Sequence, residues 1–240
     1  MPYPFPLIAH PAGDWKNPFE NIRIEMVLAH NMFIRGTNAI YAQARGIQDT
    51  QVKPFVFFCI NFFGGLHHHH HIEETLIFPF LDAKLGDGAM GHNVEQHHVF
   101  LGKLGELEEY LKAVQAGTEA YRGEKIVEML DAFTEEMVVH LRDEINTLEP
   151  SKLRAALTEQ DLKDLNAQLE KKILSEVSLV TTLPIGLCCH NKASAPHFPA
   201  LPAPILWVTK YVLYYIHSDA WAFAPCDKHG TLKPGFGNDA

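Results

Sequence analysis

The most regular feature of the sequence is the helical spacing of its apolar residues along four long stretches. The predicted helices cover residues 19–45, 54–80, 91–116 and 119–148. In each stretch, apolar side chains recur three and four positions apart, as they do on a helix with one buried face. This pattern predicts an all-α protein in which four helices pack around a shared core.

A histidine interrupts the apolar face of each predicted helix. The four residues are His30, His69, His97 and His140. A polar group in the middle of an apolar face is costly to bury, on the order of several kcal/mol for an unpaired ion. Four helices that each direct an imidazole into one core are an arrangement that builds metal sites in helical bundles.

The second helix carries the densest part of this pattern, the run HHHHHIEE at residues 67–74. Side chains four positions apart stand one above the other on a helix, so His69 stands over Glu73. His70 and Glu74 form an alternative pair, one residue out of register. Because one turn of helix directs only one of five consecutive residues at the centre, the other histidines should face solvent, line an entrance or orient ligands. They are His67, His68, His70 and His71.

The fourth helix repeats the spacing, with Glu144 four residues after His140. Six polar groups in one core need a common partner. Two cations provide it, because imidazoles can bind each ion while the carboxylates of Glu73 and Glu144 bridge the pair. A mixed nitrogen and oxygen shell favours two iron ions, with an oxo or hydroxo bridge, and leaves zinc and manganese as alternatives.

Two consecutive glycines, Gly64 and Gly65, come just before the histidines. Glycine in a helix interior costs roughly 1 kcal/mol relative to alanine. The pair therefore indicates either close packing or a bend, and the sequence leaves both interpretations open.

The remaining segments predict an arm and an extension around the bundle. Residues 1–18 are rich in proline and aromatic residues and indicate an N-terminal arm, and residues 19–150 form the bundle. Residues 151–240 predict a C-terminal extension that packs on it.

The extension has three predicted parts. Thr158, as an N-cap with Asp161 in the first turn, predicts a helix that runs to residue 176. Residues 182–204 are rich in proline and predict an irregular connection. Residues 205–223 predict an aromatic helix that packs back on the bundle.

Composition narrows the class of protein. A net charge of −9 over 240 residues argues against a nucleic-acid surface, which needs clustered cations. Four cysteines without paired spacing favour a reducing compartment, and residues 1–15 lack the pattern of a secretory signal, so we expect a cytoplasmic protein. The apolar run at residues 205–216 contains Lys210 and is shorter than the roughly 20 residues that span a membrane.

Four segments resemble the motifs of the hemerythrin-like (HHE cation-binding) family. They read LAHNMFIRGTNAIY, HHHIEETLIFPFL, EQHHVFLGKL and VVHLRDEINTLEP, and they occur in the family's order within residues 20–150. The resemblance implies an up-down four-helix bundle that holds a dimetal centre. The metal ligands that it implies are His30, His69, Glu73, His97, His140 and Glu144.

The chain departs from the oxygen carriers of this family at two positions. Carriers have a second histidine four residues before His97, where this chain has Asn93. The nearby His92 lies about 140° around the helix from His97, so it could substitute only if the helix were distorted. Carriers also place the last carboxylate five residues after the histidine, where this chain has Ile145.

The missing imidazole predicts two metal ions that both have exchangeable positions. Such a pair favours oxidation chemistry over reversible oxygen binding. We therefore expect a non-heme di-iron protein that binds or activates dioxygen, peroxide or nitric oxide, with a small organic substrate as its other partner. The alternatives are a carrier or sensor without turnover, and a metal-storage or detoxifying protein. Neither nucleic acid nor a membrane span is expected.

Overall fold

The computed structural model describes residues 4–199 and 201–236 of the chain. Within these residues the regular structure is helical, and one isolated antiparallel bridge joins Cys226 to Leu232. The prediction of an all-α protein is therefore confirmed. Residues 1–3 of the predicted arm and residues 237–240 of the predicted extension lie outside the described part.

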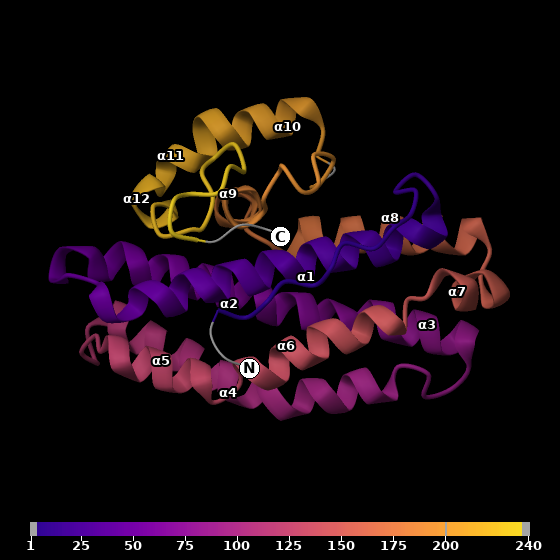
Figure 1. Cartoon of the computed structure of the whole chain (residues 1–240), viewed down its shortest axis with the longest axis horizontal. Coiled ribbons are helices and arrows are strands. Elements are labelled where there is room, and N and C mark those ends of the chain that lie inside the picture. Colours follow the sequence, from indigo (N-terminus) through magenta and orange to yellow (C-terminus); the bar gives the residue numbers. More distant parts are fainter. Residues whose placement is uncertain (1–3, 200, 237–240) are drawn as a thin grey trace.

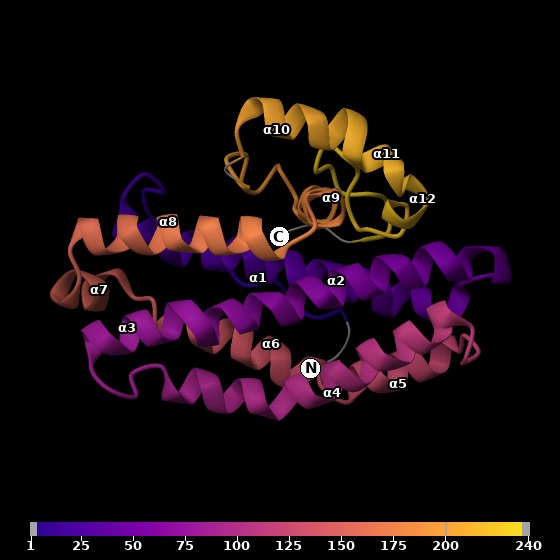
Figure 2. The ribbon, with the colours of Figure 1, turned by 180° about the vertical axis from the view of Figure 1, so that it is seen from behind.

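Long helices running side by side form the body of the molecule (Figures 1 and 2). They are α1 (Pro18–Gln43), α2 (Val52–Ile72), α4 (Gly91–Ala116), α5 (Gly123–Asp131) and α6 (Thr134–Asp143). A π-helical turn, Glu73–Ile77, continues α2 into α3 (Phe78–Leu85). The bounds of α4 are those predicted, and Gly117 ends it in the left-handed conformation that glycine adopts without strain.

The predicted fourth helix is broken between α5 and α6. Phe133 leaves the helical conformation and is fully buried, so the break turns its ring into the core. Lys103 donates a hydrogen bond to the carbonyl of Ala132 at 2.7 Å, and Thr134 donates one to the carbonyl of Leu130 at the same distance. These bonds satisfy backbone groups that the break exposes.

The helices α1 and α2 are in close contact at Gly36. A Cβ atom at this position would overlap the ring of Phe62, which is fully buried in α2. Glycine therefore allows the close approach of these two helices. Gly64 and Gly65 differ, since a Cβ at either would meet no atom within 4 Å. Close packing does not explain that pair.

The C-terminal part adds α7 at one end of the body and the later helices along one side of it (Figure 1). They are α7 (Pro150–Ala156), α8 (Glu159–Glu176), α9 (Leu179–Cys189), α10 (Ala203–Val208), a π-helical turn (Thr209–Leu213), α11 (Tyr214–Ile216) and α12 (Ser218–Trp221). The predicted N-cap is confirmed, because Thr158 and Asp161 form a reciprocal capping box. The prediction of an irregular segment at 182–204 is wrong at its start, where α9 continues to Cys189.

The packing of α9 explains that error. Pro184 lies inside the helix and argued for irregular structure, but Ile185, Leu187, Cys188 and Cys189 are buried. Burial of this apolar face outweighs the hydrogen bond that proline removes.

The aromatic segment packs on the body most completely at its end. Trp221 is fully buried, whereas Trp207, Tyr211 and Tyr215 are 59%, 47% and 56% exposed. Between these residues, Thr209 is fully buried, so the segment has one packed and one exposed face. Among the described residues, no single helix is long and apolar enough to cross a membrane, and one bent pair, α8 with α9, passes that test on length and composition.

The described part of the N-terminal arm lies along α1. Asn38 exchanges two hydrogen bonds with the backbone of Phe5, and Asn31 exchanges two with the backbone of Ile8. Phe5 is 5% exposed and joins the main core. Polar side chains on α1 thus hold the arm in place.

Candidate metal centre

The structure brings all six predicted ligands together, with His70 as a seventh residue. α1 carries His30, α2 carries His69 and His70, α4 carries His97 and α6 carries His140. Glu73 begins the π-helical turn, and Glu144 begins the short 3-10 turn Glu144–Asn146. His69 keeps 18% of its side chain exposed, and the other six residues are fully buried.

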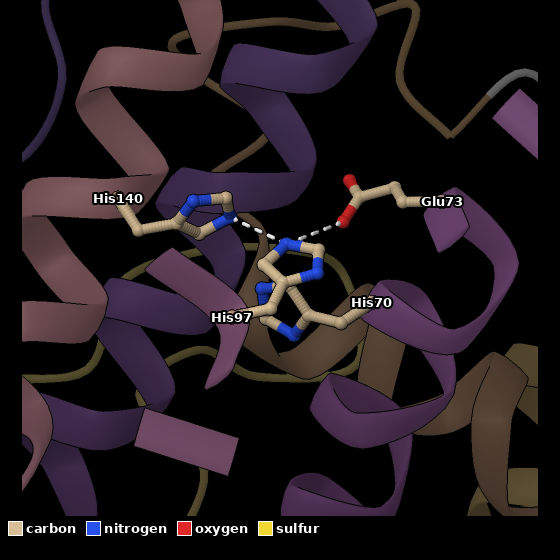
Figure 3. A group of neighbouring side chains, drawn as sticks. All are labelled: His70, Glu73, His97 and His140. Carbon is tan, nitrogen blue, oxygen red and sulfur yellow. Dashed lines mark hydrogen bonds and ion pairs between the residues drawn. The ribbon is translucent and has the colours of Figure 1, made fainter. Parts of the chain in front are cut away.

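Four of these residues converge into what we name the inner site. Its members are His70, Glu73, His97 and His140. Each offers a ligand atom within 4.8 Å of the others. The Nε2 atoms of His97 and His140 lie 3.0 Å apart, and Nε2 of His97 lies 3.6 Å from Oε2 of Glu73 (Figure 3).

Three residues form a second group, which we name the outer site. They are His30, His69 and Glu73. The Nε2 atoms of His30 and His69 lie 3.2 Å apart, and Nε2 of His69 lies 2.9 Å from Oε1 of Glu73. Glu73 therefore belongs to both sites, with one carboxylate oxygen toward each. This is the geometry of a bridging carboxylate.

Glu144 also lies between the two sites. Its Oε2 atom is 3.3 Å from Nε2 of His30 and 3.7 Å from Nε2 of His140. Two carboxylates thus stand between an inner set of three imidazoles and an outer set of two. Such a mixed set of nitrogen and oxygen donors suits iron, manganese or zinc.

His70 is the main correction to the sequence analysis. It was predicted outside the centre, yet it is fully buried and its ring centroid lies 4.6 Å from that of His97. Successive residues on a helix are about 100° apart, so two neighbours can reach two adjacent sites even though they cannot reach one point. The π-helical turn that starts at Glu73 lies at this place, as such turns often do at functional sites.

The other three histidines of the run lie outside the cluster. His67 pairs with Glu108 of α4 at 3.1 Å, and His68 pairs with Glu176 of α8 at 3.0 Å. His71 is exposed. The two pairs join α2 to α4 and to α8. His67 and His68 thus lie outside the cluster, as the sequence predicts.

Asn93 does not contribute to the cluster. It is buried, and its side-chain nitrogen lies 3.4 Å from Oγ1 of Thr147. His92, the proposed substitute, is exposed. His70 brings a further imidazole to the inner site, where the sequence predicts that one is missing.

Hydrogen bonds on the far ring nitrogens orient the inner imidazoles. Nδ1 of His70 lies 2.9 Å from the Leu66 carbonyl, and Nδ1 of His140 lies 3.2 Å from Oε1 of Gln96. Nδ1 of His97 lies 2.8 Å from Oε1 of Glu74. Acceptors at Nδ1 place the proton there and leave the Nε2 lone pair facing the centre. Glu74, the alternative partner of His70, thus supports His97 instead.

Burial controls the protonation of the cluster. It lowers the pKa of His69 to about 4 and that of His140 to about 3, and it lowers the pKa of His70 well below its usual range. These imidazoles are neutral at pH 7. Burial, reinforced by the neighbouring Glu144 carboxylate, raises the pKa of Glu73 well above its usual value. Burial opposes ionisation of Glu144 as well and is the largest single influence, but the surrounding imidazoles of His30, His140 and His69 together outweigh it and lower the pKa to about 2.

The buried polar atoms of the cluster fit a pair of cations. Among the described residues, Nε2 of His70 and all four carboxylate oxygens of Glu73 and Glu144 are buried without a well-directed hydrogen bond. Unpaired lone pairs that face one another across about 3 Å repel unless a positive charge lies between them. Metal ions would remove that repulsion and complete the missing contacts.

A cavity of about 630 Å³ lies against the outer site. α1 and α2 form one wall, and α8, α9 and the segment around Phe198 form the other. Of the seven clustered residues, His69 is the one found among the described lining residues. The outer site therefore opens toward a space of ligand size, while the inner site is enclosed.

Comparison with known proteins agrees with this centre. No solved structure matches the chain. A protein of Cryptosporiopsis sp. (strain 8999) named "Dimeric xanthone biosynthesis cluster protein R11" is 29% identical over 239 residues, which cover 96% of this chain and 89% of the relative. Residues 22–151 match the family described as the hemerythrin HHE cation binding domain. Since this match covers more than half of the 240 residues, the chain belongs to the hemerythrin HHE cation-binding family.

Proposed function

We propose that this protein is a non-heme di-iron oxidoreductase that uses dioxygen to oxidise a small organic molecule. The observation that carries the proposal is the cavity of about 630 Å³ that reaches His69 at the outer site. A carrier of dioxygen needs only a narrow path to its metals. A space of this size beside a metal ligand serves a larger molecule.

The proposal assigns the inner metal to His70, His97 and His140, and the outer metal to His30 and His69. Glu73 and Glu144 would bridge them. This assignment rests on the two groups of converging donor atoms and assumes an up-down four-helix bundle built from α1, α2 with α3, α4, and α5 with α6.

Iron would supply electrons and Lewis acidity at this centre. The protein's own residues hold the geometry and exclude water. Phe78 stacks on His97 with ring centroids 5.5 Å apart, and Phe100 lies 5.0 Å from His70 and 5.5 Å from His140. These rings close the inner site, so the exchangeable position and the bound molecule belong on the outer side.

Glu73 also handles a proton. Without metal its raised pKa favours the protonated carboxyl group, and cation binding would displace that proton. The inner imidazoles are already neutral and need no such step. Cation binding at this centre would therefore release few protons.

The named relative supports an organic substrate. Its printed name places it in a gene cluster for dimeric xanthone biosynthesis, and the similarity extends over nearly the whole chain. It therefore includes α8 and α9, which wall the cavity. We propose that this chain likewise acts on an organic intermediate of a biosynthetic route.

A carrier or sensor without turnover is the second candidate. The count of three inner and two outer imidazoles favours it, because that count leaves one metal saturated and one open. Storage has less support, since His67 and His68 of the histidine run are paired with carboxylates rather than left free to collect metal.

Anaerobic loading with ferrous iron, followed by dioxygen, separates these candidates. With an aromatic substrate present, the proposal expects dioxygen consumption matched by oxidised product in the mass spectrum. A stable, fully reversible oxygen adduct with no product would favour the carrier. Iron uptake well above two ions per chain would favour storage.

A further inference from the structure

The cavity beside His69 has walls that select for one class of ligand. Most of its lining is apolar, and three aromatic rings, Phe33, Phe62 and Phe198, contribute to it. Phe33 also packs against His69, with ring centroids 5.1 Å apart. Aromatic and apolar side chains of this kind favour a ring compound over a polar one.

The charge of the cavity excludes anions. Its described lining residues include two carboxylates, Glu25 and Glu176, and neither lysine nor arginine. Away from the metal centre at His69, a carboxylate or phosphate group would meet no cationic side chain in the described lining, and burying it there costs several kcal/mol. Fatty acids and acyl thioesters of nucleotides are therefore poor ligands, and a neutral molecule is favoured.

The polar groups of the cavity accept hydrogen bonds. Asn61 donates its side-chain amide to the Phe57 carbonyl at 2.8 Å, which leaves its side-chain oxygen as an acceptor. Glu25 adds carboxylate oxygens, whereas those of Glu176 are already bonded to Lys172 and His68. Such acceptors recognise hydroxyl groups on a neutral ring.

Gly64 and Gly65 give the cavity an open floor. They line it one turn before His69, and a Cβ at either would meet no atom within 4 Å. Gly186 on the opposite wall, in α9, is equally open. Each glycine in a helix interior costs about 1 kcal/mol, so glycines without a packing reason indicate a space that must stay empty of side chains.

The spacing of residues along α2 sets the length of the cavity floor. Asn61, Gly65 and His69 follow one another at intervals of four residues and share one helix face. At 1.5 Å per residue, Asn61 lies ~12 Å along the helix from His69. A flat molecule of two or three fused rings can span that distance, with a hydroxyl at one end and its reacting carbon near the metal.

We propose that the cavity is the binding site for a neutral, hydroxylated, fused-ring aromatic compound that lies on Gly64 and Gly65 with one end at His69. This inference rests on the proposed function, because it names the substrate class of the same centre. The pair of His68 and Glu176, 3.0 Å apart, holds the end of α8 over that floor.

Binding to the full chain loaded with zinc tests the site without any turnover. The probes are 1-hydroxyanthraquinone, anthraquinone-2-carboxylate and 1-dodecanol, measured by tryptophan fluorescence quenching and equilibrium dialysis. The neutral ring compound should bind at least about tenfold more tightly than the other two. No binding of 1-hydroxyanthraquinone, or equal binding of the carboxylate, would overturn the proposal.

Variants locate the bound molecule. Gly65→Leu should weaken binding at least about tenfold by filling the floor, while metal content stays at two ions per chain. Gly102→Leu is the matched control, since Gly102 is also an open helix glycine but lies on α4, outside the lining. It should change affinity less than twofold.

Gly186→Leu fills the same space from the opposite wall, in α9. It replaces Gly65→Leu as the test if circular dichroism shows that the Gly65→Leu protein is misfolded. Wild-type affinity in a folded Gly65→Leu or Gly186→Leu protein would contradict the site. Probe binding that follows these expectations, with no oxidation by the iron-loaded protein in dioxygen, would retain the site and reject the proposed oxidoreductase.

Discussion

The inner and outer sites share two carboxylates but differ in their surroundings. The inner site takes three imidazoles from three helices, and aromatic rings enclose it. The outer site has two imidazoles, and one of them, on His69, is partly exposed beside an apolar cavity. The two sites have similar donor atoms, so the side from which a second molecule can reach the centre depends on which site the surrounding side chains leave open.

The same contrast appears on the two sides of α2. Toward α1 its side chains pack so closely that Gly36 is needed opposite Phe62. Toward α8 and α9 it presents two glycines with open space above them. One helix therefore carries both the core and the floor of the cavity, and the histidine run lies where these faces meet.

Replacing the shared carboxylate should have the largest effect. Glu73→Gln removes a ligand from both sites, so metal affinity should fall by more than the roughly 10- to 100-fold typical of supporting residues. The matched control is Glu74→Gln, which keeps an acceptor for Nδ1 of His97 but removes the negative charge, and its effect should stay within that range. Metal content after dialysis measures both. Retention of two ions by the Glu73 variant would refute the bridging assignment.

Removing His70 should affect the inner site alone. His70→Asn should reduce metal content from two ions per chain to one, because an inner imidazole is lost while His30 and His69 remain. His71→Asn, at the exposed neighbour, should retain both ions. If the two variants bind metal equally, His70 is a core residue and not a ligand.

Replacing glycine with alanine should have opposite effects on stability on the two sides of α2: at Gly36 of α1, which packs against α2, and at Gly64 of α2, which faces the cavity. Gly36→Ala should lower the free energy of unfolding by about 1–3 kcal/mol, because the methyl group overlaps Phe62. Gly64→Ala should raise it by about 0.5–1 kcal/mol, since the space is open and alanine favours the helix. Denaturant unfolding of the metal-free proteins measures both changes. Equal effects would remove the distinction between the faces.

The pH dependence of metal binding should be shallow. The raised pKa of Glu73 means that binding displaces a proton wherever this carboxyl group is protonated, so affinity should rise with pH over a measured range of about pH 5 to pH 7, by no more than about tenfold per unit. His69 and His140, with pKa values of about 4 and about 3, hold no proton in this range and add nothing to the slope. Competition with a chromophoric chelator across this range gives the slope. A thousandfold change per unit would show that protonated imidazoles compete with the metal.

Apolar periodicity was sufficient to predict the fold class and several helix bounds. It predicted the bounds of α4, while the start of α8 followed from the capping pattern of Thr158 and Asp161. It missed the break at Phe133, because that residue lies on the same apolar stripe whether the helix is continuous or broken. It also missed α9, where burial of the apolar face against the body outweighs Pro184.

The predicted ligand positions converge in the structure, with one addition. Spacing of four residues identified Glu73 and Glu144, since it follows from helix geometry alone. Helix spacing presents His69 and His70 as alternatives for one central point, whereas two adjacent sites can accept both neighbours, 100° apart. The cavity was beyond prediction, as it depends on how α8 and α9 pack over two glycines.

Mössbauer spectroscopy of the protein loaded with ⁵⁷Fe tests the central claim most directly, because it counts iron environments and detects coupling between them. The account predicts two iron ions per chain in different environments, magnetically coupled through the bridging carboxylates of Glu73 and Glu144. A single isolated iron, or iron that fails to bind at these histidines, would contradict it.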